Sequence, residues 1–210
     1  MAFNLLRTAK YQISATKPAN FPPDEGIEVA FAGRSNAGKS SCLNVIANQK
    51  ALARVSKTPG RTQMINFFSL QDESLKLVDL PGYGYAKVPE AMRKDWGKNI
   101  QAFLETRQSL VGLVMLMDAR HPLSPLDQQM IDWAMARQLP LHAVLTKADK
   151  LSRNQQNQSL LGVRKSLSSE QGCTAQLFSS LKRQGIDELD ERLKSWMQPA
   201  TATGDLPEQP

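Results

Sequence analysis

The residues best suited to chemistry in this sequence form a glycine-rich run that ends in a lysine and two hydroxyl side chains. The run reads Gly33-Arg34-Ser35-Asn36-Ala37-Gly38-Lys39-Ser40-Ser41. It matches the G-x-x-x-x-G-K-S/T pattern of a phosphate-binding loop. Gly33 and Gly38 can take backbone angles closed to other residues, so the loop N–H groups can converge on phosphate oxygens. We expect Lys39 to reach the outer phosphates and Ser40 to ligate Mg²⁺.

The stretches on either side of this run are those that a phosphate loop needs. Residues 27–32 are apolar and rich in strand formers, and residues 41–49 place Leu43, Ile46 and Ala47 on one helical face. A strand, a glycine loop and a helix N-terminus in this order bring positive potential to a bound phosphate. The context therefore favours a phosphate loop over a chance glycine turn.

A second segment supplies an acidic residue and a glycine directly after a predicted strand. Asp79-Leu80-Pro81-Gly82 follows the apolar stretch 75–80, and Asp79 lies 46 residues after Gly33. A carboxylate at this position can hold Mg²⁺ through water, and the Gly82 amide can contact a terminal phosphate. When that phosphate leaves, the amide loses its partner and the loop relaxes. The D-x-x-G pattern alone is also a common turn.

Two later segments bear on the nucleotide base. They are Thr146-Lys147-Ala148-Asp149, after the apolar run 141–146, and Phe178-Ser179-Ser180, after the last predicted strand. The Asp149 carboxylate can accept hydrogen bonds from guanine N1–H and its exocyclic amine, whereas adenine would leave it unpaired. We expect the Lys147 stem to lie over the base, and backbone amides of residues 178–180 to contact the guanine carbonyl oxygen. Alone, each segment could equally be a surface turn.

Thr146 stands where the usual form of this base-recognition pattern has asparagine. A hydroxyl makes fewer hydrogen bonds than an amide, although it can still bond locally. We expect guanine selectivity to be kept and nucleotide affinity to be reduced.

These segments occur in the order found in translation-factor-like GTPases, and two strings are more specific. Lys57-Thr58-Pro59-Gly60-Arg61-Thr62-Gln63 and Asp79-Leu80-Pro81-Gly82-Tyr83-Gly84-Tyr85-Ala86 resemble strings of the EngB (YihA/YsxC) GTPases. The similarity covers about residues 20–198. It implies a Ras-like P-loop GTPase that binds GTP and GDP with Mg²⁺ and hydrolyses GTP. It also implies a role in assembly of the bacterial large ribosomal subunit and, in many species, in septation.

The resemblance also assigns residues to the site. Besides the phosphate loop, the D-x-x-G segment and the two base segments, the nucleotide contacts would include Gly60, Arg61, Thr62, Gln63 and Met64. Thr62 would be the switch threonine that closes over Mg²⁺ and the terminal phosphate, with Thr58 as its rival. The metal ligands would then be Ser40, Thr62 and Asp79, and the catalytic residues Lys39, Thr62 and Gly82.

The positioning of the attacking water is the least specified part of the site. Tyr83 stands where many GTPases have a water-orienting glutamine, so we expect slow intrinsic turnover that depends on an outside element. Gln63 is a candidate for the missing role. Asn36 resembles the asparagine that holds K⁺ in potassium-activated GTPases, where a cation replaces the charge of an arginine finger. The alternative is that Asn36 only shapes the loop.

The whole pattern predicts a doubly wound α/β domain with a mostly parallel six-stranded sheet and one antiparallel edge strand. The expected organisation is a lead-in over residues 1–26 with a short helix over 4–13, a GTPase domain over 27–198, and a disordered tail over 199–210. Strands are expected at 27–32, 64–70, 75–80, 110–118, 141–146 and 175–178. Helices are expected at 41–49, 89–107, 125–138, 152–168 and 186–197.

Composition bears on partners and compartment. The chain has 26 basic and 20 acidic residues, a net charge of +6, which suits a polyanionic partner but also a solubilising surface. No run reaches the length of a membrane span, and Cys42 and Cys173 make no disulfide framework, so we expect a cytoplasmic monomer.

The regions around Thr62 and around Asp79-Leu80-Pro81-Gly82 are the two predicted switch segments, which would respond to the terminal phosphate. Cations and aromatics interleave around them, as in RNA-binding surfaces. They are Arg54, Lys57, Arg61, Tyr83, Tyr85, Lys87, Arg93, Lys94, Trp96 and Lys98. This favours ribosomal RNA or a large-subunit precursor as partner, or else a solvated helix face over buried aromatics. A P-loop ATPase or kinase and an RNA-binding scaffold with a structural nucleotide remain alternative functions.

Overall fold

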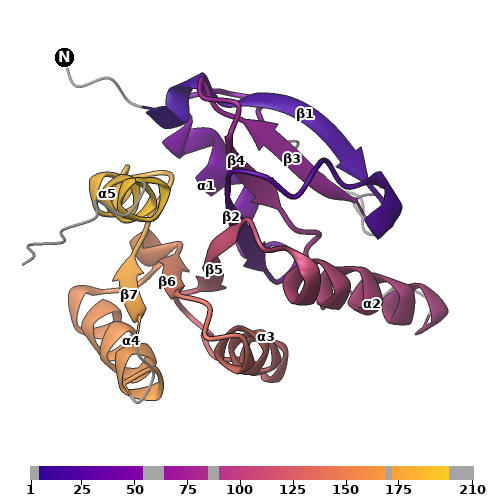
Figure 1. Ribbon diagram of the computed structural model, residues 1–210. Helices are drawn as coiled ribbons and strands as arrows, with labels where there is room; N and C mark the ends of the chain where they lie inside the picture. The colour runs from indigo at the N-terminus through magenta and orange to yellow at the C-terminus, as the bar shows by residue number, and fades with distance from the viewer. Residues whose placement is uncertain (1–4, 54–63, 85–89, 169–171, 199–210) are drawn as a thin grey trace, which may run out of the picture.

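Seven strands form a single sheet in the order β1-β3-β4-β2-β5-β6-β7 (Figure 1). The computed structural model describes residues 5–53, 64–84, 90–168 and 172–198, and for residues 90–96 the backbone alone. The strands are β1 (Lys10–Ala15), β2 (Ile27–Gly33), β3 (Ile65–Ser69), β4 (Leu75–Asp79), β5 (Leu110–Asp118), β6 (Leu141–Thr146) and β7 (Cys173–Leu177). β4, β2, β5, β6 and β7 pair in parallel, and β3 is antiparallel to both β4 and β1.

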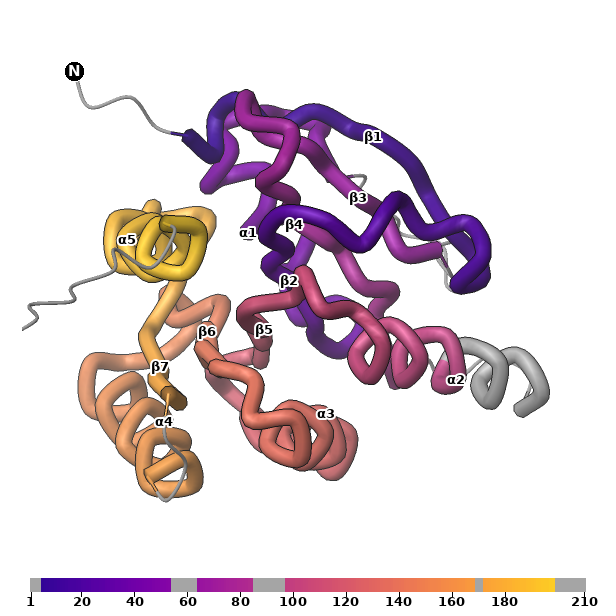
Figure 2. The backbone as a smooth tube through the Cα atoms, in the orientation of Figure 1, coloured from indigo at the N-terminus to yellow at the C-terminus, as the bar shows by residue number. Residues whose placement is uncertain are grey.

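The expectation of six strands is wrong by one, and the added strand is β1. The predicted short helix over residues 4–13 is a 3-10 helix, η1 (Leu5–Thr8), followed by β1, which runs alongside β3 (Figure 2). The first four residues of β1 are exposed, so they lack the alternation that marks a strand with one buried face. The antiparallel strand β3 is therefore an inner strand, and the expected lead-in contributes the edge of the sheet.

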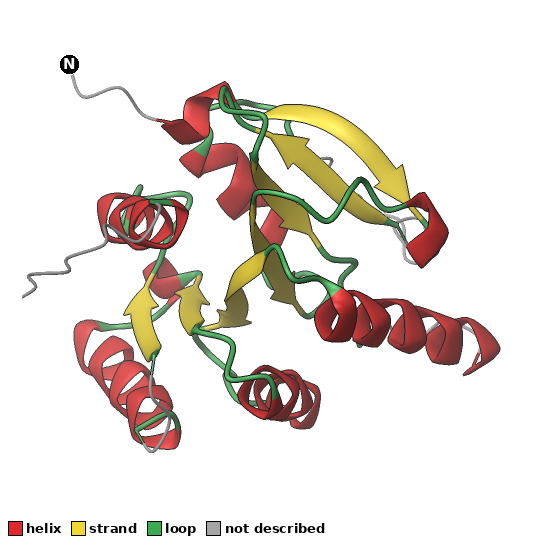
Figure 3. Ribbon diagram, viewed as in Figure 1, coloured by secondary structure: helices red, strands yellow, loops and turns green. Residues whose placement is uncertain are grey.

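Helices cover both faces of the sheet, as right-handed crossovers between parallel strands require (Figure 3). They are α1 (Lys39–Ile46), α2 (Glu90–Thr106), α3 (Pro125–Ala136), α4 (Arg153–Ser166) and α5 (Ile186–Met197), with 3-10 helices η2 (Pro18–Asn20) and η3 (Ala148–Lys150). Apolar side chains of α1 and α5 pack with one face, and those of α2, α3 and α4 pack with the other. The mostly parallel, doubly wound α/β architecture is confirmed.

Local sequence signals explain where the helices begin. α3 and α4 each start with a capping box, formed by Ser124 with Asp127 and by Ser152 with Gln155. α1 and α5 each follow a left-handed glycine.

Over the described residues, no helix has both the length and the apolar character to cross a bilayer.

Candidate functional site

The phosphate loop connects the end of β2 to the start of α1. Gly38 has φ +91° and Asn36 has φ +64°, so both lie in the left-handed region, which suits glycine and asparagine. Gly33 does not, which corrects the expectation that both glycines serve unusual backbone angles. A Cβ on Gly33 would lie 2.7 Å from the carbonyl oxygen of Leu116 on β5. Gly33 is therefore needed for close approach between β2 and β5.

Lys39, the first residue of α1, and Asp79, the last residue of β4, face each other. The Lys39 ammonium donates a hydrogen bond to Asp79 Oδ1, and both residues are almost fully buried. Ser40 follows Lys39 in the first turn of α1. A hydroxyl and a carboxylate supply the hard oxygen donors that Mg²⁺ prefers when phosphates complete its shell. Ser40 and Asp79 thus fit the predicted metal role.

The segment after Asp79 is fixed against the phosphate loop by backbone contacts. The N–H of Ser35 donates to the carbonyl oxygen of Tyr83 at 2.7 Å, and the N–H of Tyr83 donates to that of Gly33 at 3.3 Å. A Cβ on Gly82 would lie 3.3 Å from the Ser35 backbone. Gly82 therefore lies directly beside the phosphate loop.

Tyr83 is a buried side chain in this structure. Its hydroxyl donates to Asp127 Oδ1 at 2.8 Å, and only 2% of the residue is exposed. Burial, together with the Asp127 charge, raises the pKa of Tyr83 far above its usual range. The interpretation of Tyr83 as part of an RNA-stacking surface is therefore wrong. Tyr83 instead links the segment that follows Asp79 to α3.

The predicted base-recognition segment contacts the phosphate loop directly. Thr146 Oγ1 donates to the carbonyl oxygen of Ala37 at 2.5 Å, and Lys147 Nζ donates to that of Asn36 at 2.7 Å. Thr146 also contacts the Met117 carbonyl oxygen at 3.0 Å, so its hydroxyl does bond locally. Asparagine is not needed to join these two segments.

Asp149 and Ser179 come together at the other end of the site. The Ser179 hydroxyl donates to Asp149 Oδ1 at 2.6 Å, and this hydrogen bond is the main cause that lowers the pKa of Asp149. The N–H of Ala148 donates to the Phe178 carbonyl oxygen at 3.1 Å, which ties the two base segments side by side. An ionised Asp149 is an acceptor only, as guanine recognition requires.

Sequence reasoning missed Asp118, the last residue of β5. Its carboxylate accepts from Lys147 Nζ at 2.9 Å and from Arg120 Nη2 at 2.7 Å. Burial opposes its ionisation, but these hydrogen bonds prevail and hold the pKa of Asp118 well below its usual range. The sequence did contain a signal for Asp118: like Asp79, it is an acidic residue at the carboxyl end of an apolar strand.

Several predicted residues lie outside the described part of the chain. These are Thr58, Gly60, Arg61, Thr62 and Gln63, together with Arg54, Lys57, Tyr85 and Lys87 of the basic and aromatic set. For Arg93, Lys94 and Trp96 the backbone alone is described. Met64 is exposed just before β3.

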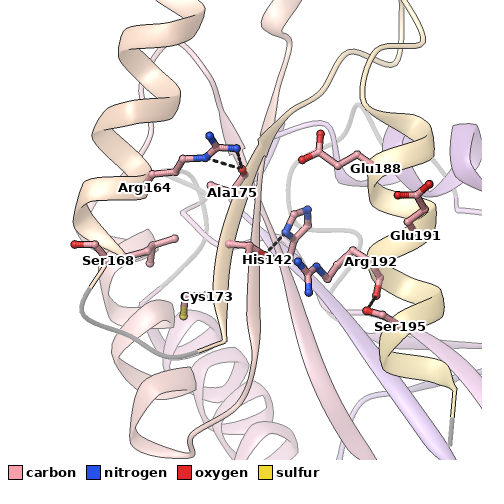
Figure 4. A pocket seen from close by; sticks show the side chains of 11 residues that line it. His142, Arg164, Ser168, Cys173, Ala175, Glu188, Glu191, Arg192 and Ser195 are labelled. Atoms are coloured by element: carbon pink, nitrogen blue, oxygen red, sulfur yellow. Dashed lines mark hydrogen bonds between the residues drawn. The ribbon is translucent and has the colours of Figure 1, made fainter. Parts of the chain in front are cut away.

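A separate hollow of about 590 Å³ lies between α4, β7 and α5 (Figure 4). It is lined by His142 near the start of β6, whereas the nucleotide segments gather at the end of that strand. Arg164 reaches across from α4 to donate to the Ala175 carbonyl oxygen on the free edge of β7. This hollow is not part of the nucleotide site.

The fold and this constellation of loops at the carboxyl ends of parallel strands define the class: a P-loop GTPase. Comparisons with known proteins agree. Residues 28–147 match the family model described as 50S ribosome-binding GTPase. The chain is 54% identical over 205 residues to the probable GTP-binding protein EngB of Azoarcus sp. strain BH72, covering 97% of this chain and 98% of that protein. It is 53% identical over 199 residues to the Escherichia coli O139:H28 protein of the same description, covering 93% of this chain and 94% of that protein.

Solved structures show the same fold. A crystal structure of a probable GTP-binding protein engB superposes with a TM-score of 0.66 at 20% identity, over 81% of this chain and 98% of that one. Aquifex aeolicus Era bound to GDP and AlF4⁻ superposes with a TM-score of 0.65 at 20% identity, over 83% of this chain and 58% of that one. The chain belongs to the EngB family of GTP-binding proteins, and its GTPase domain is consistent with GTP hydrolysis.

Proposed function

We propose that this protein is a Mg²⁺-dependent GTP switch that acts in assembly of the large ribosomal subunit in the cytoplasm. The observation that carries the guanine-nucleotide site is the direct bonding of Thr146 and Lys147 to the phosphate-loop carbonyl oxygens. It holds the phosphate and base segments as one unit, so that a single nucleotide can engage both. Lys39, Ser40 and Asp79 would hold the phosphates and the metal, which neutralises charge on the transferring phosphoryl group.

Isothermal titration with GTP, GDP and ATP tests the base assignment. GTP and GDP should bind, and ATP should bind at least about a hundredfold more weakly, because adenine leaves the Asp149 carboxylate unpaired. Asp149→Ala should abolish that preference. Asp132→Ala is the matched control, since Asp132 is an exposed carboxylate that contacts only its α3 neighbour Gln128 in the described structure. ATP bound as tightly as GTP by the unaltered protein would refute the assignment.

The ribosomal role is supported by the family model, described as ribosome-binding, and by the net charge of +6. Sedimentation with isolated large and small subunits, in GTP, GDP or no nucleotide, tests it. We expect co-sedimentation with large subunits that is strongest in GTP and weakens as salt rises. Nucleotide-independent binding would favour a scaffold, and no binding to large subunits would contradict the role. The proposed link to septation follows from the family resemblance. Depleting the protein from cells and observing septation tests this link separately.

Asn36 gives the proposed hydrolysis a second test. Its left-handed backbone suits either a loop-shaping residue or a K⁺ ligand. Turnover in KCl and in NaCl at matched ionic strength separates the two. Asn36→Gly keeps a residue that tolerates φ above zero and removes the side-chain amide. If K⁺ is bound, KCl should stimulate the unaltered protein and not this variant; equal rates in both salts would leave Asn36 with the loop role.

A further inference from the structure

A line of polar side chains crosses three strands from the exposed edge of the sheet to Asp79. Ser14 on β1, Asn66 on β3 and Asp79 on β4 stand directly opposite one another in the strand register. Ser14 Oγ donates to Asn66 Oδ1 at 2.6 Å, and Asn66 Nδ2 donates to Asp79 Oδ2 at 3.2 Å. The Tyr11 hydroxyl lies 2.9 Å from Ser14 Oγ, and Tyr11 is 60% exposed.

A bulge in β1 adds Tyr11 to this line. In a regular strand, residues three apart point to opposite faces of the sheet. The register of β1 shifts between Tyr11, which pairs with Phe68, and Ile13, which pairs with Phe67. The extra residue returns Tyr11 to the same face as Ser14, where its ring packs edge-on against Phe68 at 6.2 Å.

The pairing of Asp79 sets the direction of every proton in the line. Its Oδ1 accepts from Lys39 and its Oδ2 accepts from the amide nitrogen of Asn66. The amide oxygen of Asn66 then faces Ser14 and takes its single hydroxyl proton. Ser14 can therefore only accept from Tyr11. Since all three donors point inward, each bond polarises the next and strengthens the hold on Asp79.

We propose that Asn66 is a positioning residue for Asp79, supported by Ser14, and that it sets how firmly the site retains Mg²⁺. Asp79 uses its two oxygens differently: Oδ1 faces Lys39, and Oδ2 is held by Asn66. Fixing Oδ2 fixes the plane of the carboxylate and thereby the direction in which Oδ1 points. Partners that orient a metal-associated carboxylate commonly change metal affinity by 10–100-fold when removed. This inference rests on the proposed Mg²⁺–nucleotide site.

Release of a fluorescent methylanthraniloyl-GDP into excess GDP, measured in EDTA and over a Mg²⁺ series, tests the proposal. Mg²⁺ should slow release from the unaltered protein. In Asn66→Ala, the Mg²⁺ concentration that gives half of this slowing should rise by about tenfold. In Ser14→Ala, it should rise by about two- to threefold, because the amide loses only its orienting donor. In EDTA, all proteins should release the nucleotide at the same rate.

Asn99→Ala is the matched control, because Asn99 donates to the Thr16 carbonyl oxygen just after β1 at 2.7 Å and lies outside the line to Asp79. It should behave as the unaltered protein. If Asn66→Ala matches Asn99→Ala across the Mg²⁺ series, or if it speeds release equally in EDTA, Asn66 does not act through Asp79. Should Asn66→Ala fail to fold, an unshifted Ser14→Ala would overturn the proposal instead. If Mg²⁺ fails to slow release from the unaltered protein, the proposed metal site itself is wrong.

Discussion

Lys147 illustrates how single side chains organise this site. Its backbone is left-handed (φ +57°), and its ammonium contacts both the Asn36 carbonyl oxygen and Asp118. A strained backbone of this kind persists only where its surroundings over-determine it. Two charge-assisted hydrogen bonds supply that constraint here, so the residue that was expected to lie over the base also holds the phosphate loop in place.

His142 provides a prediction at the residue scale. It is 2% exposed; its Nε2 is 2.8 Å from Gln176 Oε1, and its Nδ1 is 2.7 Å from Thr174 Oγ1. Because the amide oxygen only accepts, Nε2 carries a proton. Burial lowers the pKa of His142 from 6.5 to about 4. The unfolded chain therefore takes up a proton before the folded one does, and stability is lost as pH falls from about 6.5 towards 4.

Urea unfolding between pH 7.5 and pH 5 measures this loss. From those two pKa values, His142 should account for about 2 kcal/mol of it. His142→Gln should be less stable at pH 7.5 but should lose about 2 kcal/mol less on acidification. His121→Gln serves as control, since His121 is exposed, and should follow the unaltered protein. Parallel curves for all three proteins would show that His142 is not held neutral.

At the scale of elements, packing between α5 and the sheet depends on a glycine in β5. A Cβ on Gly112 would lie 2.5 Å from the Trp196 ring of α5, whereas one on Gly162, in exposed α4, would meet nothing within 4 Å. Gly112→Ala must push the indole aside and should destabilise the protein by about 1–3 kcal/mol. Gly162→Ala should stabilise it by about 0.5–1 kcal/mol, because alanine loses less entropy in a helix.

Thermal or urea unfolding of the two glycine variants gives opposite signs if this packing is correct. The same substitution is made in both, so a general preference for alanine would move them in the same direction. A Gly112→Ala variant as stable as the unaltered chain would mean that α5 has room to move away from β5.

The elements that could be predicted from the sequence are those with a strong local signal. β5 is a nearly unbroken apolar run, and α5 has a clear amphipathic period, so both were bounded correctly. β1 could not be predicted, because its pairing with β3 rather than its own pattern makes it a strand. The same holds in the site: the phosphate loop is a contiguous motif, whereas Asn66 meets Asp79 only through the strand register.

At the scale of the whole molecule, the segment before β2 is fastened to the domain by Arg107, which follows α2. Its guanidinium pairs with both oxygens of the fully buried Glu28 and donates to the carbonyl oxygens of Pro22 and Pro23. Nearby, burial opposes ionisation of Asp24, but hydrogen bonds from Ser109 and the backbone lower its pKa to about 2. One cluster thus joins the start of β2, the end of α2 and the proline-rich connection from β1.

Arg107→Met should therefore cost about 3–5 kcal/mol in urea unfolding, because it strands the Glu28 charge in the interior. Glu28→Met with Arg107→Met removes both charges and should recover a large part of that loss, since two apolar side chains can fill the same space. Arg120→Met is the comparison: the arginine side chain in its pair with Asp118 is 44% exposed, so losing that pair should cost much less stability than Arg107→Met. If the double variant is as unstable as the single one, the guanidinium acts through the proline carbonyl oxygens instead, and the connection to β1 rather than the buried carboxylate is what Arg107 secures.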